Sequence, residues 1–193
     1  MVMRHLILGG ARSGKTRAAL DRALDWSRRL SANVTYVATA QALDEEMKER
    51  IARHRAERPT TWSTVEAPLQ LASALAGIQP SSVVVIDCLT LWLTNALLLD
   101  FDEERPRAQL AAWSREREAF IAWLSAYSGV VVIVSNEVGG GIVPVSSLAR
   151  RFQDEQGWLN QDVARTCDRV TLVVAGVELS IKDASMMSPH NRL

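Results

Sequence analysis

The sequence predicts a single α/β domain: a mostly parallel central sheet with helices on both faces and a terminal antiparallel strand. Short, almost wholly apolar runs alternate with longer helical segments along the chain. Strands of that composition are typical of a parallel sheet whose faces are both covered by helices. The chain shows no internal repeat, so we predict one domain over 1–182 and a polar, disordered tail over 183–193.

The first half of the chain alternates strand and helix patterns. Apolar or β-branched runs predict strands at His5–Leu8, Val34–Ala38, Thr61–Glu66 and Val83–Ile86. Periodic segments between them predict helices at Arg17–Leu30, Asp44–Glu57 and Pro68–Ala76. The helix at Asp44–Glu57 begins with acidic and ends with basic residues, as the helix dipole favours, and Pro59 ends it.

The second half continues the alternation. Helices are predicted at Leu89–Leu99, Gln109–Tyr127 and Ser146–Arg165, and strands at Val130–Val134, Val170–Val174 and Val177–Ile181. The last two strands form the terminal pair. The charged, proline-containing segment Asp100–Arg107 is expected to be the most mobile internal loop.

Composition narrows the class of protein. The formal net charge is zero, so no basic surplus points to nucleic acid or an anionic membrane as a partner. Two cysteines, Cys88 and Cys167, provide no disulfide framework, which fits a reducing cytoplasm. The N-terminus lacks the pattern of a signal peptide, and the longest apolar runs are too short to span a bilayer.

Residues Gly9–Thr16 follow the pattern G-x-x-x-x-G-K-[ST], the phosphate-binding loop or P-loop. A predicted strand precedes the loop and a predicted helix follows it, which is the context that such a loop needs. Glycines allow main-chain N–H groups to surround phosphate oxygens, and the N-terminus of the helix favours negative charge. Lys15 would reach the β- and γ-phosphates and Thr16 would offer its hydroxyl to Mg²⁺. The alternative is a glycine turn that caps a helix.

Asp87 follows an apolar strand directly. An acidic residue in that position matches the Walker B pattern, in which the carboxylate holds Mg²⁺ at the carboxyl end of the sheet. An aspartate that caps the following helix would look the same in sequence.

His54 lies on the helix predicted at Asp44–Glu57. Leu43, Met47, Ile51 and His54 share one face, so a structural histidine beside an apolar stripe is the simplest interpretation. The surrounding arginines favour a second interpretation, in which His54 is a nucleophile. Their positive charges would disfavour the imidazolium and so leave a neutral, nucleophilic ring, and their guanidinium groups could bind phosphates. These arginines are Arg50, Arg53, Arg55 and Arg58. Alternatively, Glu46–Arg50 and Glu49–Arg53 pairs form a solvated face.

Two further features have open interpretations. The glycine-rich loop Asn136–Pro144 follows a predicted strand and would be a mobile flap, a close approach to a ligand or a plain turn. Trp62, Trp92, Trp113, Trp123 and Trp158 are expected in the core or at a subunit interface.

Together, these motifs resemble one family, the bifunctional adenosylcobinamide kinase / adenosylcobinamide-phosphate guanylyltransferases of cobalamin biosynthesis. The resemblance covers about Leu6–Lys182. It rests on the P-loop and on these segments: Tyr36–Ala40, Asp44–Met47 with Arg50 and Ile51, His54-x-x-x-Arg58-Pro59, Trp62–Glu66, Asp87–Thr90 with Asn95, Asn136–Gly139 and Gly141–Pro144.

The resemblance implies a RecA-like P-loop NTPase fold, a homotrimer and two reactions. ATP or GTP phosphorylates adenosylcobinamide, and GTP then donates GMP to adenosylcobinamide phosphate through a guanylyl-histidine, here His54, releasing pyrophosphate. Lys15 would assist catalysis, and Thr16 and Asp87 would hold Mg²⁺. The implied nucleotide contacts are Gly9, Gly10, Ala11, Arg12, Ser13, Gly14, Lys15, Thr16, Ala38, Thr39, Ala40, Arg55, Ala56, Glu57, Arg58, Glu66 and Asp87.

Two other functions compete with this one. A simpler P-loop kinase for another metabolite would leave His54 structural. A regulatory GTPase or RecA-like ATPase is less compatible with the sequence, because GTPases read guanine with an [N/T]-K-x-D motif. None of the three lysines, Lys15, Lys48 and Lys182, lies in such a motif.

Overall fold

The structure is a computed structural model that describes residues 1–99 and 106–183. Its strands are β1 (Met3–Gly9), β2 (Val34–Ala38), β3 (Ser63–Glu66), β4 (Val83–Asp87), β5 (Val130–Asn136), β6 (Arg169–Val174) and β7 (Val177–Asp183). Its helices are α1 (Lys15–Leu30), α2 (Glu45–Ala56), α3 (Leu71–Ala76), α4 (Leu89–Thr94), the π-helical η1 (Asn95–Leu99), α5 (Pro106–Ala126) and α6 (Ser147–Thr166).

All seven strands form one sheet in the order β3-β2-β4-β5-β1-β6-β7. Every neighbouring pair is parallel except β6 and β7, which are antiparallel. The predicted mostly parallel sheet with a terminal antiparallel strand is therefore confirmed. The strand β5 lies between β1, which leads into the P-loop, and β4, which ends at Asp87.

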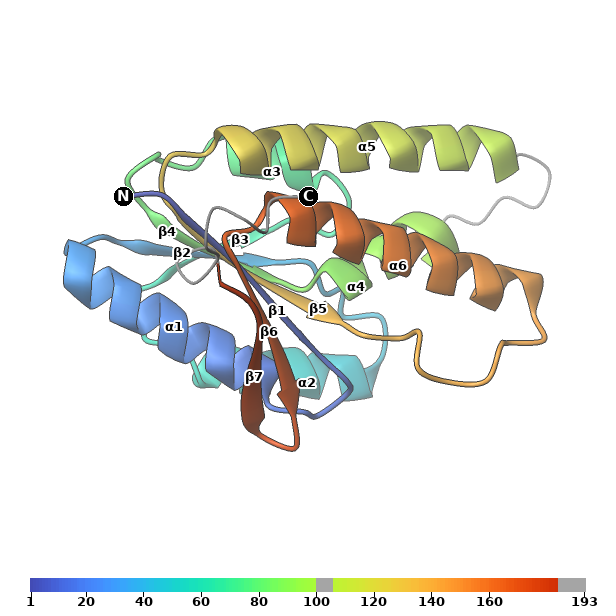
Figure 1. Ribbon diagram of the computed structural model, residues 1–193, viewed down its shortest axis with the longest axis horizontal. Helices are drawn as coiled ribbons and strands as arrows, with labels where there is room; N and C mark the ends of the chain where they lie inside the picture. The colour runs from blue at the N-terminus through green and yellow to red at the C-terminus, as the bar shows by residue number, and fades with distance from the viewer. Residues whose placement is uncertain (100–105, 184–193) are drawn as a thin grey trace, which may run out of the picture.

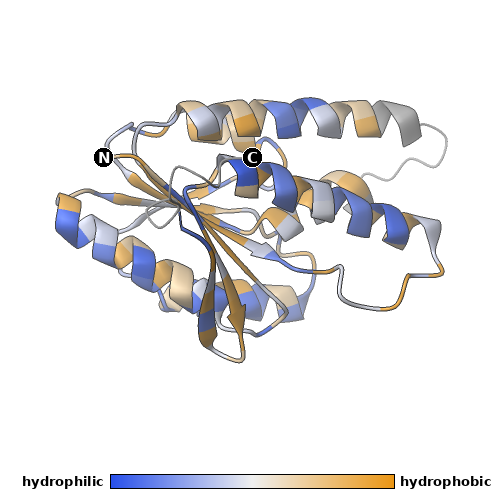
Figure 2. Cartoon of the chain, in the orientation of Figure 1, coloured by the Kyte–Doolittle hydropathy of each residue, from blue (hydrophilic) through white to orange (hydrophobic). Residues whose placement is uncertain are grey.

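Helices cover both faces of the sheet, as predicted (Figure 1). In that view α1 and α2 lie below the sheet, and α3, α4, α5 and α6 lie above it. Apolar residues concentrate on the strands, whereas α1 and α6 carry many hydrophilic side chains (Figure 2). Successive side chains of a strand point to opposite faces of the sheet. In β1, Leu6 therefore packs with the upper helices and Ile7 packs with α1.

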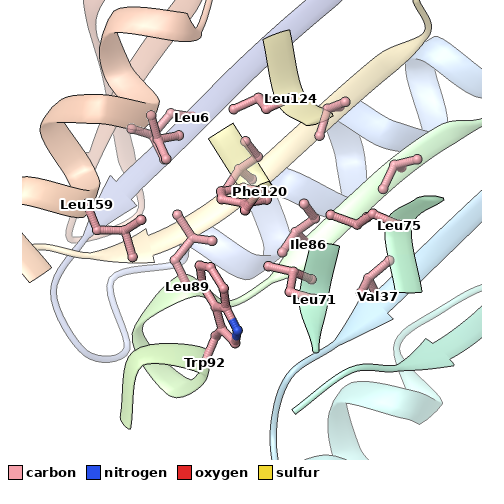
Figure 3. Packing of buried hydrophobic residues seen from close by; sticks show 14 of the residues in the cluster. Leu6, Val37, Leu71, Leu75, Ile86, Leu89, Trp92, Phe120, Leu124 and Leu159 are labelled. Carbon is pink, nitrogen blue, oxygen red and sulfur yellow. The ribbon is translucent and has the colours of Figure 1, made fainter. Parts of the chain in front are cut away.

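The larger core lies between the sheet and the upper helices. The ring of Trp92 makes edge contacts with Trp113 and Phe120, at centroid distances of 4.8 and 5.3 Å. Leu71 and Leu159 bring α3 and α6 against the same cluster (Figure 3). This packing fixes the start of α4, directly after Asp87, against the rest of the domain.

Several element boundaries differ from the predicted ones. The helix predicted at Leu89–Leu99 changes to π-helical geometry at Asn95, where the buried Asn95 amide donates to the carbonyls of Thr39 and Pro68. The helix α5 begins at Pro106, where proline is favoured as a first helical residue. The rest of the predicted mobile loop, 100–105, lies outside the described residues.

The C-terminal strand is longer than expected. Lys182 donates hydrogen bonds to the carbonyls of Ala164 and Cys167 at 2.9 and 2.6 Å, beside the end of α6. Asp183, expected to begin the tail, is the last residue of β7. The remainder of the predicted tail, 184–193, lies outside the described residues. No helix within 1–99 and 106–183 is both long and apolar enough to cross a membrane.

Candidate active site

The P-loop occupies the turn between β1 and α1. Gly14 has φ of 100° and serves as the N-cap of α1, and Arg12 has φ of 55°. A Cβ at Gly9 would lie 2.4 Å from Ser13 Oγ and 2.6 Å from the carbonyl oxygen of Val173. Only glycine fits at position 9 without displacing the loop, so the sequence pattern has a direct steric reason here.

Lys15 begins α1 and is only 8% exposed. Its ammonium donates a 2.8 Å hydrogen bond to the carbonyl of Gly10, so the side chain folds back over the loop. Burial lowers the pKa of Lys15; the neighbouring Cys88 and Asp87 oppose that shift and Arg50 adds to it. An ammonium in this position can neutralise the charge of a bound polyphosphate.

The turn between β6 and β7 supports the P-loop from outside. The main-chain N–H of Gly176 donates a 2.9 Å hydrogen bond to the carbonyl of Ser13. A Cβ at Gly14 would lie 3.4 Å from the Cα of Gly176, so the two loops are in contact. No sequence motif indicated this support, because it joins segments far apart in the chain.

Asp87 lies at the end of β4 and faces Tyr36 of β2. The hydroxyl of Tyr36 donates a 2.7 Å hydrogen bond to Oδ2 of Asp87. Burial, followed by the charge of Asp87, raises the pKa of Tyr36 above its ordinary range. The phenol therefore stays protonated and fixes the carboxylate. Asp87 does not cap α4 with its side chain, since Cys88 is the N-cap residue and no side-chain cap bond forms there.

Thr39 connects the ends of β2 and β4. Its hydroxyl donates to the carbonyl of Cys88 at 2.7 Å and accepts from the N–H of Cys88 at 2.8 Å. Thr39 is fully buried, and the Asn95 amide holds its carbonyl. Burial also raises the pKa of Cys88 to about 12, so this thiol stays neutral. Thr39, for which a nucleotide contact is predicted, braces the segment that follows Asp87.

The helix α2 presents His54 beside the P-loop. Asp44 caps the helix by accepting a 2.7 Å bond from the N–H of Met47. At the other end, Arg58 donates to the carbonyl of His54 at 2.9 Å and lies 3.7 Å from the ring centroid of Tyr36. No residue of α2 is buried, so the predicted stripe of Met47, Ile51 and His54 does not enter the core.

A cavity of about 420 Å³ lies between the P-loop, the ends of β2 and β4, and α2. Its size is ordinary for a small-molecule site. Met47, Ile51 and His54 line it, so the apolar stripe faces a cavity instead of the interior. Predicted site residues on its walls are Ala11, Lys15, Thr16, Ala38, Ala40, His54, Arg58, Glu66 and Asp87.

A second cavity, of about 310 Å³, lies between the P-loop and α2. Arg12, Ser13, Gly14 and Glu57 are the predicted site residues that line only this one. The residues common to both cavities are Lys15, Thr16, Arg50 and His54. The structure therefore brings the imidazole, the P-loop lysine and one guanidinium to the same space.

The sequence left Glu46–Arg50 and Glu49–Arg53 ion pairs open as an alternative to phosphate-binding arginines. Neither pair forms among the residues described, and the ion pair within α2 joins Lys48 to Glu45. All four side chains instead line the second cavity, opposite the P-loop. The guanidinium groups of Arg50 and Arg53 are thus available to a bound anion, with the carboxylates of Glu46 and Glu49 on the same wall.

Some predicted contacts lie off both cavities. Gly9, Gly10, Thr39, Arg55 and Ala56 line neither one. Gly9 and Gly10 shape the loop from within. Arg55 and Ala56 project from other faces of α2, because successive helical residues are 100° apart. The cavity is also lined by residues that the sequence did not assign to the site: Tyr36, Gln41, Ala42, Pro68, Cys88 and Leu91. Asn136 lines it too, and a close approach to a ligand was one interpretation of the loop that this residue begins.

The candidate Mg²⁺ ligands share the first cavity. Thr16 and Asp87 both line it, and Tyr36 engages only one oxygen of the carboxylate. Within the described parts of the chain, no group of three or more His, Cys, Asp or Glu side chains could hold a metal by themselves. One carboxylate and one hydroxyl suit Mg²⁺, which takes its remaining ligands from phosphates and water.

Known proteins resemble this chain over nearly its whole length. A family model described as "Cobinamide kinase / cobinamide phosphate guanyltransferase" matches residues 5–181. A relative from Pseudomonas aeruginosa, named "Bifunctional adenosylcobalamin biosynthesis protein CobP", is 48% identical over 185 residues, covering 93% of this chain and 98% of the relative.

Two further relatives are named "Bifunctional adenosylcobalamin biosynthesis protein CobU". The protein from Escherichia coli is 43% identical, and the one from Salmonella typhimurium is 39% identical. Each alignment covers 93% of this chain and 100% of the relative. This chain belongs to the cobinamide kinase / cobinamide phosphate guanyltransferase family.

Proposed function

We propose that this protein phosphorylates adenosylcobinamide with ATP or GTP and then converts the product to adenosylcobinamide-GDP. The observation that carries the proposal is that Lys15, Thr16, Arg50 and His54 line both cavities. Family membership supplies the two reaction classes, and this shared wall offers a single site that could serve both.

In the kinase step, the P-loop and Lys15 hold the β- and γ-phosphates. The substrate hydroxyl forms a bond to the γ-phosphorus, the bond to the β,γ-bridging oxygen breaks, and the hydroxyl proton is released to solvent. Thr16 and Asp87 would hold Mg²⁺, with Tyr36 fixing the carboxylate. When bound, Mg²⁺ neutralises charge on the phosphates.

In the guanylyl step, an imidazole nitrogen of His54 attacks the α-phosphorus of GTP and pyrophosphate leaves. Lys15 and the P-loop hold the leaving pyrophosphate. The ring loses its proton, so the imidazole of the phosphoramidate is neutral while its phosphoryl group keeps a negative charge. A phosphate oxygen of adenosylcobinamide phosphate then attacks the same phosphorus, which gives adenosylcobinamide-GDP and restores His54. Glu66, which is exposed at the end of β3 and lines the larger cavity, would accept hydrogen bonds from guanine.

The proposal extends to the oligomeric state of the protein and to the compartment in which it works. We infer a homotrimer, as the family resemblance implies. Its support here is an exposed apolar row on the edge strand β7, formed by Val177, Leu179 and Ile181. Trp158 is 51% exposed on α6 and is also available to a partner copy. A reducing cytoplasm is supported by two buried, unpaired thiols.

The decisive assay follows both products in one reaction. Adenosylcobinamide with ATP should give adenosylcobinamide phosphate, and addition of GTP should then release pyrophosphate with adenosylcobinamide-GDP. A simpler kinase would stop at the phosphate and release no pyrophosphate. A protein without corrinoid-dependent turnover of either nucleotide would contradict the proposal.

A further inference from the structure

The loop 137–146, between β5 and α6, exposes three large apolar side chains within four positions. Ile142 is 96% exposed, Val143 is 72% exposed and Val145 is 97% exposed. Single exposed apolar residues are ordinary, whereas a group of them marks a surface that binds a ligand or a partner. Figure 1 shows this loop extending away from the sheet beyond the end of β5.

Side chains of α6 hold both ends of this loop. Near its start, the amide of Gln153 donates a 3.0 Å hydrogen bond to the carbonyl of Val138. Near its end, the guanidinium of Arg150 donates to the carbonyls of Pro144 and Val145, at 2.9 and 2.5 Å. These bonds use only main-chain atoms of the loop, so they fix its course and leave its apolar side chains uncovered.

The loop begins at the wall of the larger cavity. Asn136, the residue directly before it, lines that cavity together with Lys15 and Asp87. The N–H of Glu137 donates a 3.2 Å hydrogen bond to the carbonyl of Gly9, so the start of the loop lies against the P-loop. A substrate that places one arm in the cavity can therefore contact the loop with the part that stays outside.

The size of the cavity requires such a division of the proposed corrinoid substrate. The cavity measures about 420 Å³, towards the lower end of the range for pockets that enclose drug-sized ligands. A nucleoside triphosphate would take up most of this space. The macrocycle, axial adenosyl group and amide arms of adenosylcobinamide make a much larger molecule. Only the arm that carries the reacting hydroxyl can enter beside the nucleotide, so the macrocycle must lie on the surface outside.

We propose that Ile142, Val143 and Val145 form the surface on which the corrin macrocycle of the substrate lies. This inference rests on the proposed function. Methyl groups line the periphery of a corrin, and apolar side chains that cover them remove apolar area from water, which favours binding. A second copy of this chain is a less suitable occupant, because the loop starts at the cavity and the row on β7 is available for assembly.

The test measures binding of adenosylcobinamide to a double variant that combines Ile142→Ser with Val145→Ser. Corrinoids absorb visible light, so equilibrium dialysis measures the bound substrate directly. The Kd should rise about tenfold, which corresponds to losing the burial of about one large apolar side chain. GTP without corrinoid should form the guanylyl-enzyme at the wild-type rate, because the nucleotide contacts are unchanged.

Leu30→Ser is the matched control. Leu30 is also apolar and 39% exposed, but it ends α1 just before β2 begins, at the opposite edge of the sheet from the cavity. Its substitution should leave the Kd for adenosylcobinamide unchanged.

Three results for the double variant would overturn the inference. The first is an unchanged Kd. The second is slower formation of the guanylyl-enzyme, which would mean that the loop shapes the nucleotide site. The third is a change in sedimentation, which would assign the surface to a second copy of the chain. A wild-type protein that binds no adenosylcobinamide would instead refute the proposed function, and the inference with it.

Discussion

The hydroxyl of Tyr36 donates a 2.7 Å hydrogen bond to Oδ2 of Asp87 and thereby joins two strands at the carboxyl edge of the sheet. The guanidinium of Arg58 lies over the face of the same ring, 3.7 Å from its centroid, and Arg58 bonds to the carbonyl of His54. One phenol thus connects the carboxylate proposed for Mg²⁺ with the end of the helix that carries the proposed nucleophile.

Tyr36→Phe should weaken metal binding while keeping the ring against Arg58. Without the hydroxyl, the Asp87 carboxylate loses its fixed orientation, and losing such a supporting bond typically costs about 10- to 100-fold in metal affinity. We expect the Mg²⁺ concentration for half-maximal activity to rise by about tenfold. Magnesium titration of either half-reaction measures this. Tyr127→Phe, which removes a buried hydroxyl bonded to the Gln79 and Ser82 carbonyls, serves as the control and should leave the titration unchanged.

Gly9→Ala should destabilise the fold because the new Cβ would overlap Ser13 and the carbonyl of Val173. The expected loss is about 2 kcal/mol in the free energy of unfolding, typical of overpacking. Gly10→Ala is the matched comparison, since its Cβ would meet nothing within 4 Å. Urea unfolding should show a loss at position 9 several times that at position 10. Equal losses would mean that the steric account of Gly9 is wrong.

Thr39→Val should destabilise the protein by about 2 kcal/mol. The substitution preserves volume but leaves the buried N–H of Cys88 without a partner, while the carbonyl of Cys88 keeps only the 3.2 Å bond from the N–H of Trp92. A buried hydrogen bond that is not made carries that cost. Thr35→Val is the comparison, because it removes one 3.2 Å contact with Ser63. Its effect on urea unfolding should be smaller by about 1 kcal/mol. Equal stability of the two variants would argue against the bracing role of Thr39.

His5 should make stability fall in mild acid. Burial lowers its pKa to about 4, helped by the charges of Arg22 and Arg169 and opposed by Asp183. Because the unfolded chain binds the proton more readily, stability rises with pH between about 4 and 6.5 and is lost as pH falls through that window. The full effect is about 3 kcal/mol. Urea unfolding of His5→Gln should show a flatter pH dependence; an unchanged slope relative to wild type would contradict the assignment.

The sequence predicted the elements whose signal is local. The apolar strand at Val83–Asp87 and the P-loop can be recognised from consecutive residues, and both lie where expected. Features that depend on distant contacts could not be predicted in this way. Gly176 supports Ser13 from the far end of the chain, and Asn160 fixes the main chain of Asn136 from α6.

The candidate site could be predicted only in part from the sequence, for the same reason. The spacing of Met47, Ile51 and His54 predicted a shared helix face correctly, but not that this face lines a cavity. Helical spacing likewise suggested ion pairs on α2, whereas the arginines and glutamates there face the P-loop across the second cavity. Periodicity reports which residues share a face, and tertiary packing decides what that face meets.

Labelling the protein with GTP that carries a radioactive α-phosphate tests the central claim most directly. The account predicts a covalent adduct that is labile in acid and stable in base, that maps to the peptide containing His54, and that is absent in His54→Ala. His5→Gln should retain the adduct and controls for loss of an imidazole elsewhere. An adduct of wild-type intensity in His54→Ala, or none in the wild-type protein, would contradict the account.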